Sequence, residues 1–95
     1  MTKNEIEELL KKHKPTLREN YFVSKIGLFG SYVRDEQTDQ SDVDILVEFD
    51  GPVAFEFLDL HEYLEKLFRK KVDLVTRRSL KPYARDEILS EVRYA

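Results

Sequence analysis

The chain has 95 residues, a net charge of −3 and 41% hydrophobic residues, a composition typical of one small globular domain rather than a disordered segment. Cysteine is absent, which excludes disulfide frameworks, thiolate nucleophiles and zinc–cysteine sites. The negative charge argues against a nucleic-acid-binding surface, and neither a signal segment nor a membrane span is predicted, so we expect a cytoplasmic protein.

Residues 1–20 have the pattern of an amphipathic helix. Apolar side chains recur there at helical spacing, at Ile6, Leu9, Leu10 and Leu17. Pro15 predicts a kink or break near Lys14. Residues 21–29 follow, and their aromatic and β-branched side chains predict a first strand.

A Gly-Ser pair ends this strand. Gly30 has no side chain, so the backbone can approach a phosphate closely, and Ser31 offers a hydroxyl and an N–H to the same oxygens. Taken alone, such a pair is more typical of an ordinary turn. A short helix is predicted over residues 31–36, with its N-terminus toward a bound phosphate. Within it, Arg34 would face the phosphates, brace the acidic loop or pair with a neighbouring carboxylate on the surface.

Two acidic residues open the second predicted strand, residues 43–49. Asp42 and Asp44 are two positions apart, so their side chains point to the same face of a strand. The apolar run 45–47 follows at once, which places both charges at the edge of a buried sheet. Two like charges there require a cation, and Mg²⁺ commonly binds one or two carboxylates together with substrate phosphates. The pattern therefore predicts magnesium-dependent nucleotidyl transfer.

A third carboxylate lies in the last predicted strand. A helix with an apolar stripe is predicted over residues 54–69, and residues 70–76 then form a strand that contains Asp73 among apolar neighbours. If this strand pairs with the second, their backbones are about 4.8 Å apart and Asp73 faces the other two acids. The alternative is a surface Asp73 that pairs with a nearby basic residue: Lys70, Lys71 or Arg77.

The remaining positions carry weaker signals. A final helix starts at Pro82, and its apolar residues are expected to pack on the sheet: Tyr83, Ala84, Ile88, Leu89 and Val92. His13 and His61 are expected to pack or to be solvated, because neither has a second histidine at ligand spacing. For Arg77-Arg78, contact with phosphates or a partner and simple solvation are equally compatible with the sequence.

Gly30-Ser31, ten intervening residues and Asp42-Val43-Asp44 resemble the signature of the DNA polymerase β-like nucleotidyltransferases. The segment GSYVRDEQTDQSDVDILVEF is similar to the minimal members, the MNT-domain proteins, which include MntA-type antitoxins encoded beside HEPN-domain toxins. The resemblance covers nearly the whole chain and departs at Arg34-Asp35, where members often carry Arg-Gly. It implies an α/β fold in one domain, residues 1–95, with a small mixed β-sheet and helices packed mainly on one face. The first two strands would be antiparallel, and the long helical connection predicts that the second and third are parallel.

The resemblance also implies roles for individual residues. Asp42, Asp44 and Asp73 would be the catalytic and metal-binding carboxylates, holding two Mg²⁺ ions, while Gly30, Ser31 and Arg34 would bind the nucleotide.

ATP would be the substrate. The acceptor would be a tyrosine of a cognate HEPN ribonuclease toxin, which the protein would modify with AMP and with which it could form a hetero-oligomer, without direct nucleic-acid contact. Two alternatives remain: an antitoxin that masks its partner by binding alone, and an aminoglycoside-type small-molecule nucleotidyltransferase that acts with a separate helical subunit.

Overall fold

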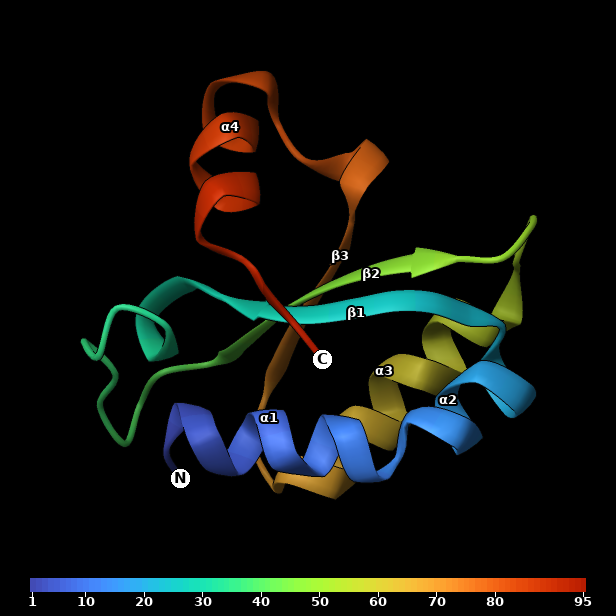
Figure 1. Cartoon of the computed structure of the whole chain (residues 1–95), viewed down its shortest axis with the longest axis horizontal. Helices are drawn as coiled ribbons and strands as arrows, with labels where there is room; N and C mark the ends of the chain where they lie inside the picture. Colours follow the sequence, from blue (N-terminus) through green and yellow to red (C-terminus); the bar gives the residue numbers. More distant parts are fainter.

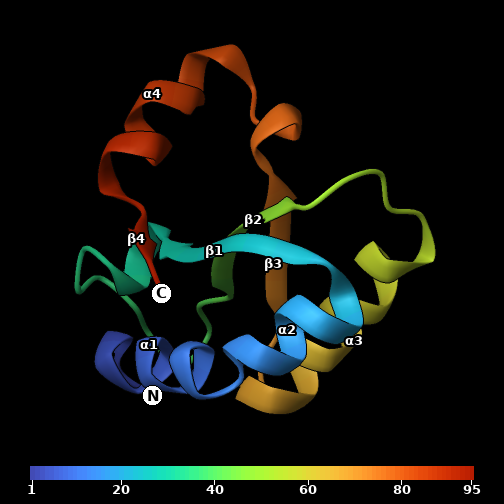
Figure 2. The same cartoon turned by 45° about the vertical axis from the view of Figure 1, so that its right-hand side comes forward.

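A four-stranded mixed sheet forms the centre of the computed structural model, which describes all 95 residues (Figure 1). The strands are β1 (Val23–Phe29), β2 (Val43–Phe49), β3 (Val72–Thr76) and β4 (Arg93–Tyr94), in the order β3-β2-β1-β4. β2 is parallel to β3 and antiparallel to β1, as predicted, so β2 is a central strand. β4 was not predicted; it pairs antiparallel with the outer edge of β1 (Figure 2).

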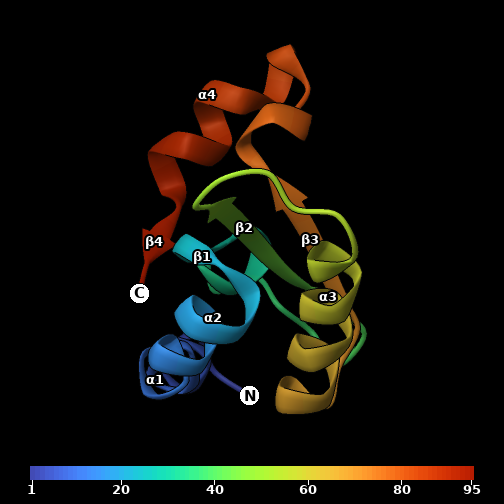
Figure 3. The same ribbon diagram turned by 90° about the vertical axis from the view of Figure 1, so that its right-hand side faces the viewer.

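Three helices cover one face of the sheet, and a fourth lies over the other (Figure 3). They are α1 (Lys3–Lys12), α2 (Lys14–Tyr21), α3 (Phe55–Phe68) and α4 (Pro82–Glu91). A cluster of 15 buried residues joins the first three helices to the sheet. A smaller cluster of Phe29, Leu46 and Leu80 lies on the opposite face, where Ile88, Leu89 and Val92 at the end of α4 pack against it. Helices packed mainly on one face are therefore confirmed.

The N-terminal helical segment breaks where proline predicts. α1 ends and α2 begins at His13, and Thr2 caps α1 through a reciprocal capping box with Glu5. The first strand starts two residues later than predicted, because Tyr21 is still helical and Phe22 adopts a left-handed conformation with φ of 60°. None of the four helices has both the length and the apolar character needed to cross a membrane.

Two local predictions are wrong. The helix expected over residues 31–36 is only a single 3₁₀ turn, Gly30–Tyr32, followed by a turn that Asp35 closes with φ of 57°. Tyr83 does not pack on the sheet and is 84% exposed, since it lies in the first turn of α4, away from the contact made by the last turn.

Candidate active site

The register between β2 and β3 brings the predicted carboxylates together. Asp44 in β2 is the direct partner of Asp73 in the parallel strand β3, so both side chains leave the sheet on the same face. Asp42 lies two residues before Asp44, just outside β2, and is near enough for its charge to act on Asp44. The face that Asp44 and Asp73 share is the face of α4, opposite the large core, because Leu46 continues the alternation into the smaller cluster. Asp73 makes no ion pair, so the alternative pairing with nearby basic residues is not observed.

Asp44 is the most electrostatically perturbed of the three acids. Burial, followed by the charges of Asp73 and Asp42, raises the pKa of Asp44 from an ordinary 3.8 to about 6. The charge of Arg34 acts in the opposite direction. Carboxylates that repel one another in this way provide hard oxygen ligands for a cation.

Position 30 requires a glycine because its backbone lies against the side chain of Asp44. Phe29 pairs with Asp44 across the antiparallel ladder, and Gly30 follows with φ of +79°, a conformation that favours glycine. A Cβ atom at Gly30 would clash with Oδ2 of Asp44. The glycine of the motif therefore leaves room for the carboxylate.

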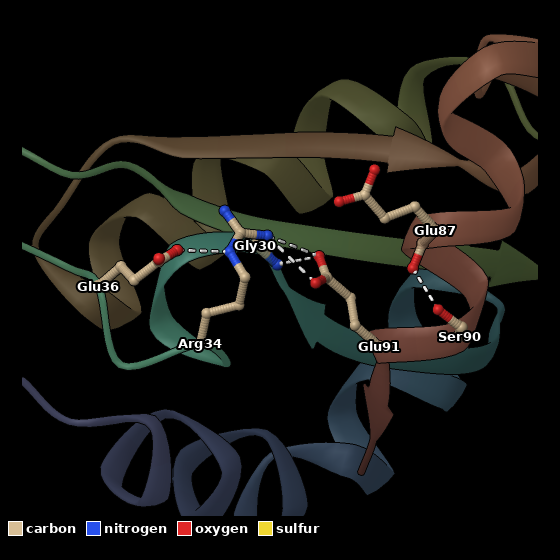
Figure 4. A network of polar contacts seen from close by, with 6 residues as sticks. All are labelled: Gly30, Arg34, Glu36, Glu87, Ser90 and Glu91. Carbon is tan, nitrogen blue, oxygen red and sulfur yellow. Dashed lines mark hydrogen bonds and ion pairs between the residues drawn. The ribbon is translucent and has the colours of Figure 1, made fainter.

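Glu91, which sequence reasoning missed, binds both Gly30 and Arg34 (Figure 4). The backbone N–H of Gly30 donates to Oε1 of Glu91 at 3.0 Å, so this N–H is not free for a phosphate. Nη1 of Arg34 donates to both oxygens of Glu91 at 3.1 Å, and Nε of Arg34 donates to Glu36 at 2.6 Å. The expected pairing of Arg34 with a neighbouring carboxylate, that of Glu36, is therefore observed, and Arg34 also pairs with the distant Glu91. A glutamate in the last turn of a helix opposes the helix dipole, and that is the signal that could have marked Glu91.

Asp35, where family members often carry glycine, adopts a backbone conformation that favours glycine. Asp35 occupies the left-handed region with φ of 57°, which glycine adopts freely and aspartate tolerates better than most residues. Lys3 from α1 forms an ion pair with Asp35 at 3.2 Å. The turn of this chain therefore accommodates an aspartate in a left-handed conformation, held by the ion pair with Lys3.

The three carboxylates suit Mg²⁺ in their chemistry, but their side chains do not surround a common point. No group of three acidic or histidine side chains in the chain is arranged to hold a metal ion. Asp44 and Asp73 are nevertheless neighbours on adjacent strands, and Asp42 and Asp73 are exposed and able to turn. Oxygen donors with mutual repulsion fit a hard cation.

The other candidate residues lie outside this cluster. His13 contacts the hydroxyl of Tyr63 and His61 contacts the carbonyl of Val72, each at 2.7 Å, which confirms that both pack. Arg77-Arg78 follow β3 and line a groove of about 750 Å³ at the opposite ends of β2 and β3 from Asp44 and Asp73.

Known proteins resemble this chain in sequence and in fold. Residues 10–95 match the family model of the nucleotidyltransferase domain. Protein adenylyltransferase MntA of Thermococcus cleftensis is 50% identical over 95 residues, which cover 99% of this chain and 96% of the relative. A solved structure described as a candidate minimal nucleotidyltransferase superposes with a TM-score of 0.80 at 29% identity, covering 98% of this chain and 95% of the other.

Two solved toxin–antitoxin complexes also contain a similar chain. One, with AMP-PNP, matches with a TM-score of 0.67 at 27% identity, over 99% of this chain and 72% of the other. The second is a tri-AMPylated Shewanella oneidensis HEPN toxin in complex with an MNT antitoxin, with a TM-score of 0.57 at 26% identity, over 97% and 66% of the two chains. Because the family model matches residues 10–95 and a relative is 50% identical, the chain belongs to the nucleotidyltransferase domain family, among its minimal protein adenylyltransferases.

Proposed function

We propose that this protein is an antitoxin that transfers AMP from ATP to a tyrosine of a cognate HEPN-domain toxin and thereby neutralises it. The observation that carries the proposal is the pairing of Asp44 with Asp73 beside the Gly30-Ser31 turn, on the sheet face opposite the large core. The related toxin–antitoxin complexes, one with AMP-PNP and one with an AMPylated HEPN toxin, support the choice of nucleotide and acceptor. We place the whole chain, residues 1–95, in one nucleotidyltransferase domain of a cytoplasmic protein.

Ser31 and Arg34 would hold the phosphates of ATP. Ser31 is partly exposed directly after Gly30, and its hydroxyl and N–H are donors. Arg34 lies one turn further on and brings a positive charge beside the acidic cluster. Gly30 would contribute indirectly, since its missing side chain leaves space for Asp44.

Two Mg²⁺ ions would be held by the three carboxylates of the site: Asp42, Asp44 and Asp73. Bound there, the metal would neutralise negative charge on the attacking and leaving oxygens. In the reaction the acceptor hydroxyl oxygen bonds to the α-phosphorus of ATP, the bond from that phosphorus to the bridging oxygen breaks, and diphosphate leaves. Asp73, the exposed member of the strand pair, would accept the hydroxyl proton.

The acceptor would come from another chain. The 95 residues form one sheet with its helices, and a related MNT antitoxin is found in complex with a separate, tri-AMPylated HEPN toxin. A bulky, anionic AMP group on the toxin would then block its access to RNA.

Co-expression with the toxin gene tests the proposal. The wild-type protein should restore growth, whereas the Asp42→Asn, Asp44→Asn double variant should not, provided that circular dichroism shows it to be folded. Full rescue by the double variant would contradict adenylyl transfer and would mean that the protein masks its partner by binding.

A further inference from the structure

Glu91 connects the last turn of α4 to the loop that carries the nucleotidyltransferase motif (Figure 4). Its carboxylate accepts from the Gly30 amide and from the Arg34 guanidinium, residues 61 and 57 positions earlier in the chain. We propose that Glu91 is a positioning residue of the nucleotide site, which orients Arg34 toward the phosphates of ATP. The inference rests on the proposed nucleotide-binding role of Arg34.

The contacts of Arg34 leave one side of its guanidinium free. Nε donates to Glu36 and Nη1 donates to both oxygens of Glu91, while Nη2 makes no hydrogen bond within the chain. A planar guanidinium fixed at two of its three nitrogens has a defined orientation. The free Nη2 can therefore donate to a phosphate without the loss of rotamer freedom that a mobile arginine would undergo on binding.

Of the two carboxylates, Glu91 is the one able to set this orientation. The side chain of Glu91 is 16% exposed, whereas that of Glu36 is 63% exposed. Ion pairs in open solvent contribute little, and an exposed glutamate changes rotamer easily. Glu91 is further fixed by the Gly30 amide and by the packing of its neighbour Val92 in the smaller core cluster.

The charge of Glu91 is otherwise unfavourable at this position. It opposes the dipole at the C-terminal end of α4, and it adds a negative charge near Asp44. A neutral side chain would avoid both costs and could still accept from the Gly30 amide. The one positively charged group that contacts the Glu91 carboxylate is the guanidinium of Arg34. We therefore infer that the negative charge of Glu91 fixes the position of this guanidinium.

Calorimetric titration with AMP-PNP and Mg²⁺ on four variants tests the inference. Glu91→Gln keeps an acceptor for the Gly30 amide and removes the charge, and we expect about tenfold weaker binding, the loss typical of one charge-assisted hydrogen bond. Glu87→Gln is the matched control, because Glu87 is an exposed glutamate one turn earlier on α4 whose side chain makes no hydrogen bond or ion pair. We expect less than a twofold change for it. Arg34→Ala should also weaken binding, and adding Glu91→Gln to it should change affinity less than twofold further.

Several results would overturn the inference. If Glu91→Gln binds AMP-PNP as tightly as wild type, Glu91 has a purely structural role. If the variant binds AMP-PNP more tightly, the negative charge of Glu91 competes with the phosphates. Additive losses in the double variant would show that Glu91 does not act through Arg34. A wild-type protein that fails to bind AMP-PNP, or an Arg34→Ala variant that binds normally, would instead contradict the proposed function itself.

Discussion

Asp44 places a carboxylate where the fold disfavours its charge. Its pKa is raised to about 6 by burial and by the other two acids, so ionised Asp44 destabilises the metal-free protein. Below pH 3.8 the group is neutral in both the folded and unfolded states. Between 3.8 and about 6 the folded chain keeps a proton that the unfolded chain has lost, so the free energy of unfolding falls as pH rises. Above a pH of about 6, Asp44 is ionised in both states, and the full loss in the free energy of unfolding is present.

Asp44→Asn should therefore stabilise the metal-free protein at pH 7.5 while abolishing activity. Because the carboxylate is partly solvated, we expect a discounted gain of about 1 kcal/mol, or a melting temperature about 4–8 °C higher. The gain should vanish near pH 4. Thermal melts across this pH range, with the exposed Asp59→Asn on α3 as control, measure it. A variant less stable than wild type at pH 7.5 would contradict the repulsion.

Gly30 and Gly51 separate the effect of steric contact from that of backbone strain. Both have positive φ, +79° and +98°, but only Gly30 lies against another group, the carboxylate of Asp44. Gly51→Ala should cost about 1 kcal/mol of stability from strain alone and leave transfer activity intact. Gly30→Ala should cost about 2–4 kcal/mol and abolish transfer, because the added methyl displaces Asp44. Equal effects of the two substitutions on activity would refute this role of Gly30.

At the level of secondary structure, the C-terminal segment holds Glu91 through its fit against β1. A Cβ on Gly27 would lie 2.8 Å from Cγ2 of Val92 and 3.0 Å from the carbonyl oxygen of Arg93, in β4. We therefore expect Gly27→Ala to shift this segment, to cost about 1–3 kcal/mol of stability and to weaken nucleotide binding without touching any proposed site residue. Hydrogen exchange of the β4 amides together with AMP-PNP titration measures both effects. Wild-type affinity in a variant with a displaced β4 would contradict the link to Glu91.

The elements with strong periodicity were predictable, and those fixed by tertiary contact were not. The apolar stripe of α3 and the apolar run of β2 identify these elements within a residue or two at each end. β4 escaped prediction because it has only two residues and depends on the space that Gly27 leaves. The 3₁₀ turn at Gly30 is shorter than the predicted helix because the turn that follows it reverses at Asp35.

The same distinction holds for the site. Asp42 and Asp44 could be singled out by local spacing, and Asp73 by its charge within an apolar strand, and the β2–β3 register brings Asp44 and Asp73 side by side. The contact of Glu91 with Gly30 could not be predicted, because the two residues are 61 positions apart; only the unfavourable place of Glu91 at the end of α4 could have marked it. The engagement of the Gly30 amide was missed for the same reason.

At the scale of the whole molecule, the proposed metal site predicts that the stability of the protein depends on Mg²⁺. Mg²⁺ should raise the melting temperature by several degrees, because a ligand that binds only the folded state stabilises it, by about 2.7 kcal/mol at a hundred times Kd. ATP added with Mg²⁺ should raise it further. The Asp42→Asn, Asp44→Asn variant serves as the control and should respond to neither. A wild-type melting curve indifferent to both ligands would argue against an intact site.

Adenylyl transfer itself is tested most directly by intact-mass spectrometry of the HEPN partner after incubation with this protein, ATP and Mg²⁺. A gain of one or more AMP units, absent with the Asp42→Asn, Asp44→Asn variant, is the expected result, and peptide mapping should locate the modification on a tyrosine. An unmodified partner that still forms a stable complex with the protein would contradict catalysis and favour masking by binding.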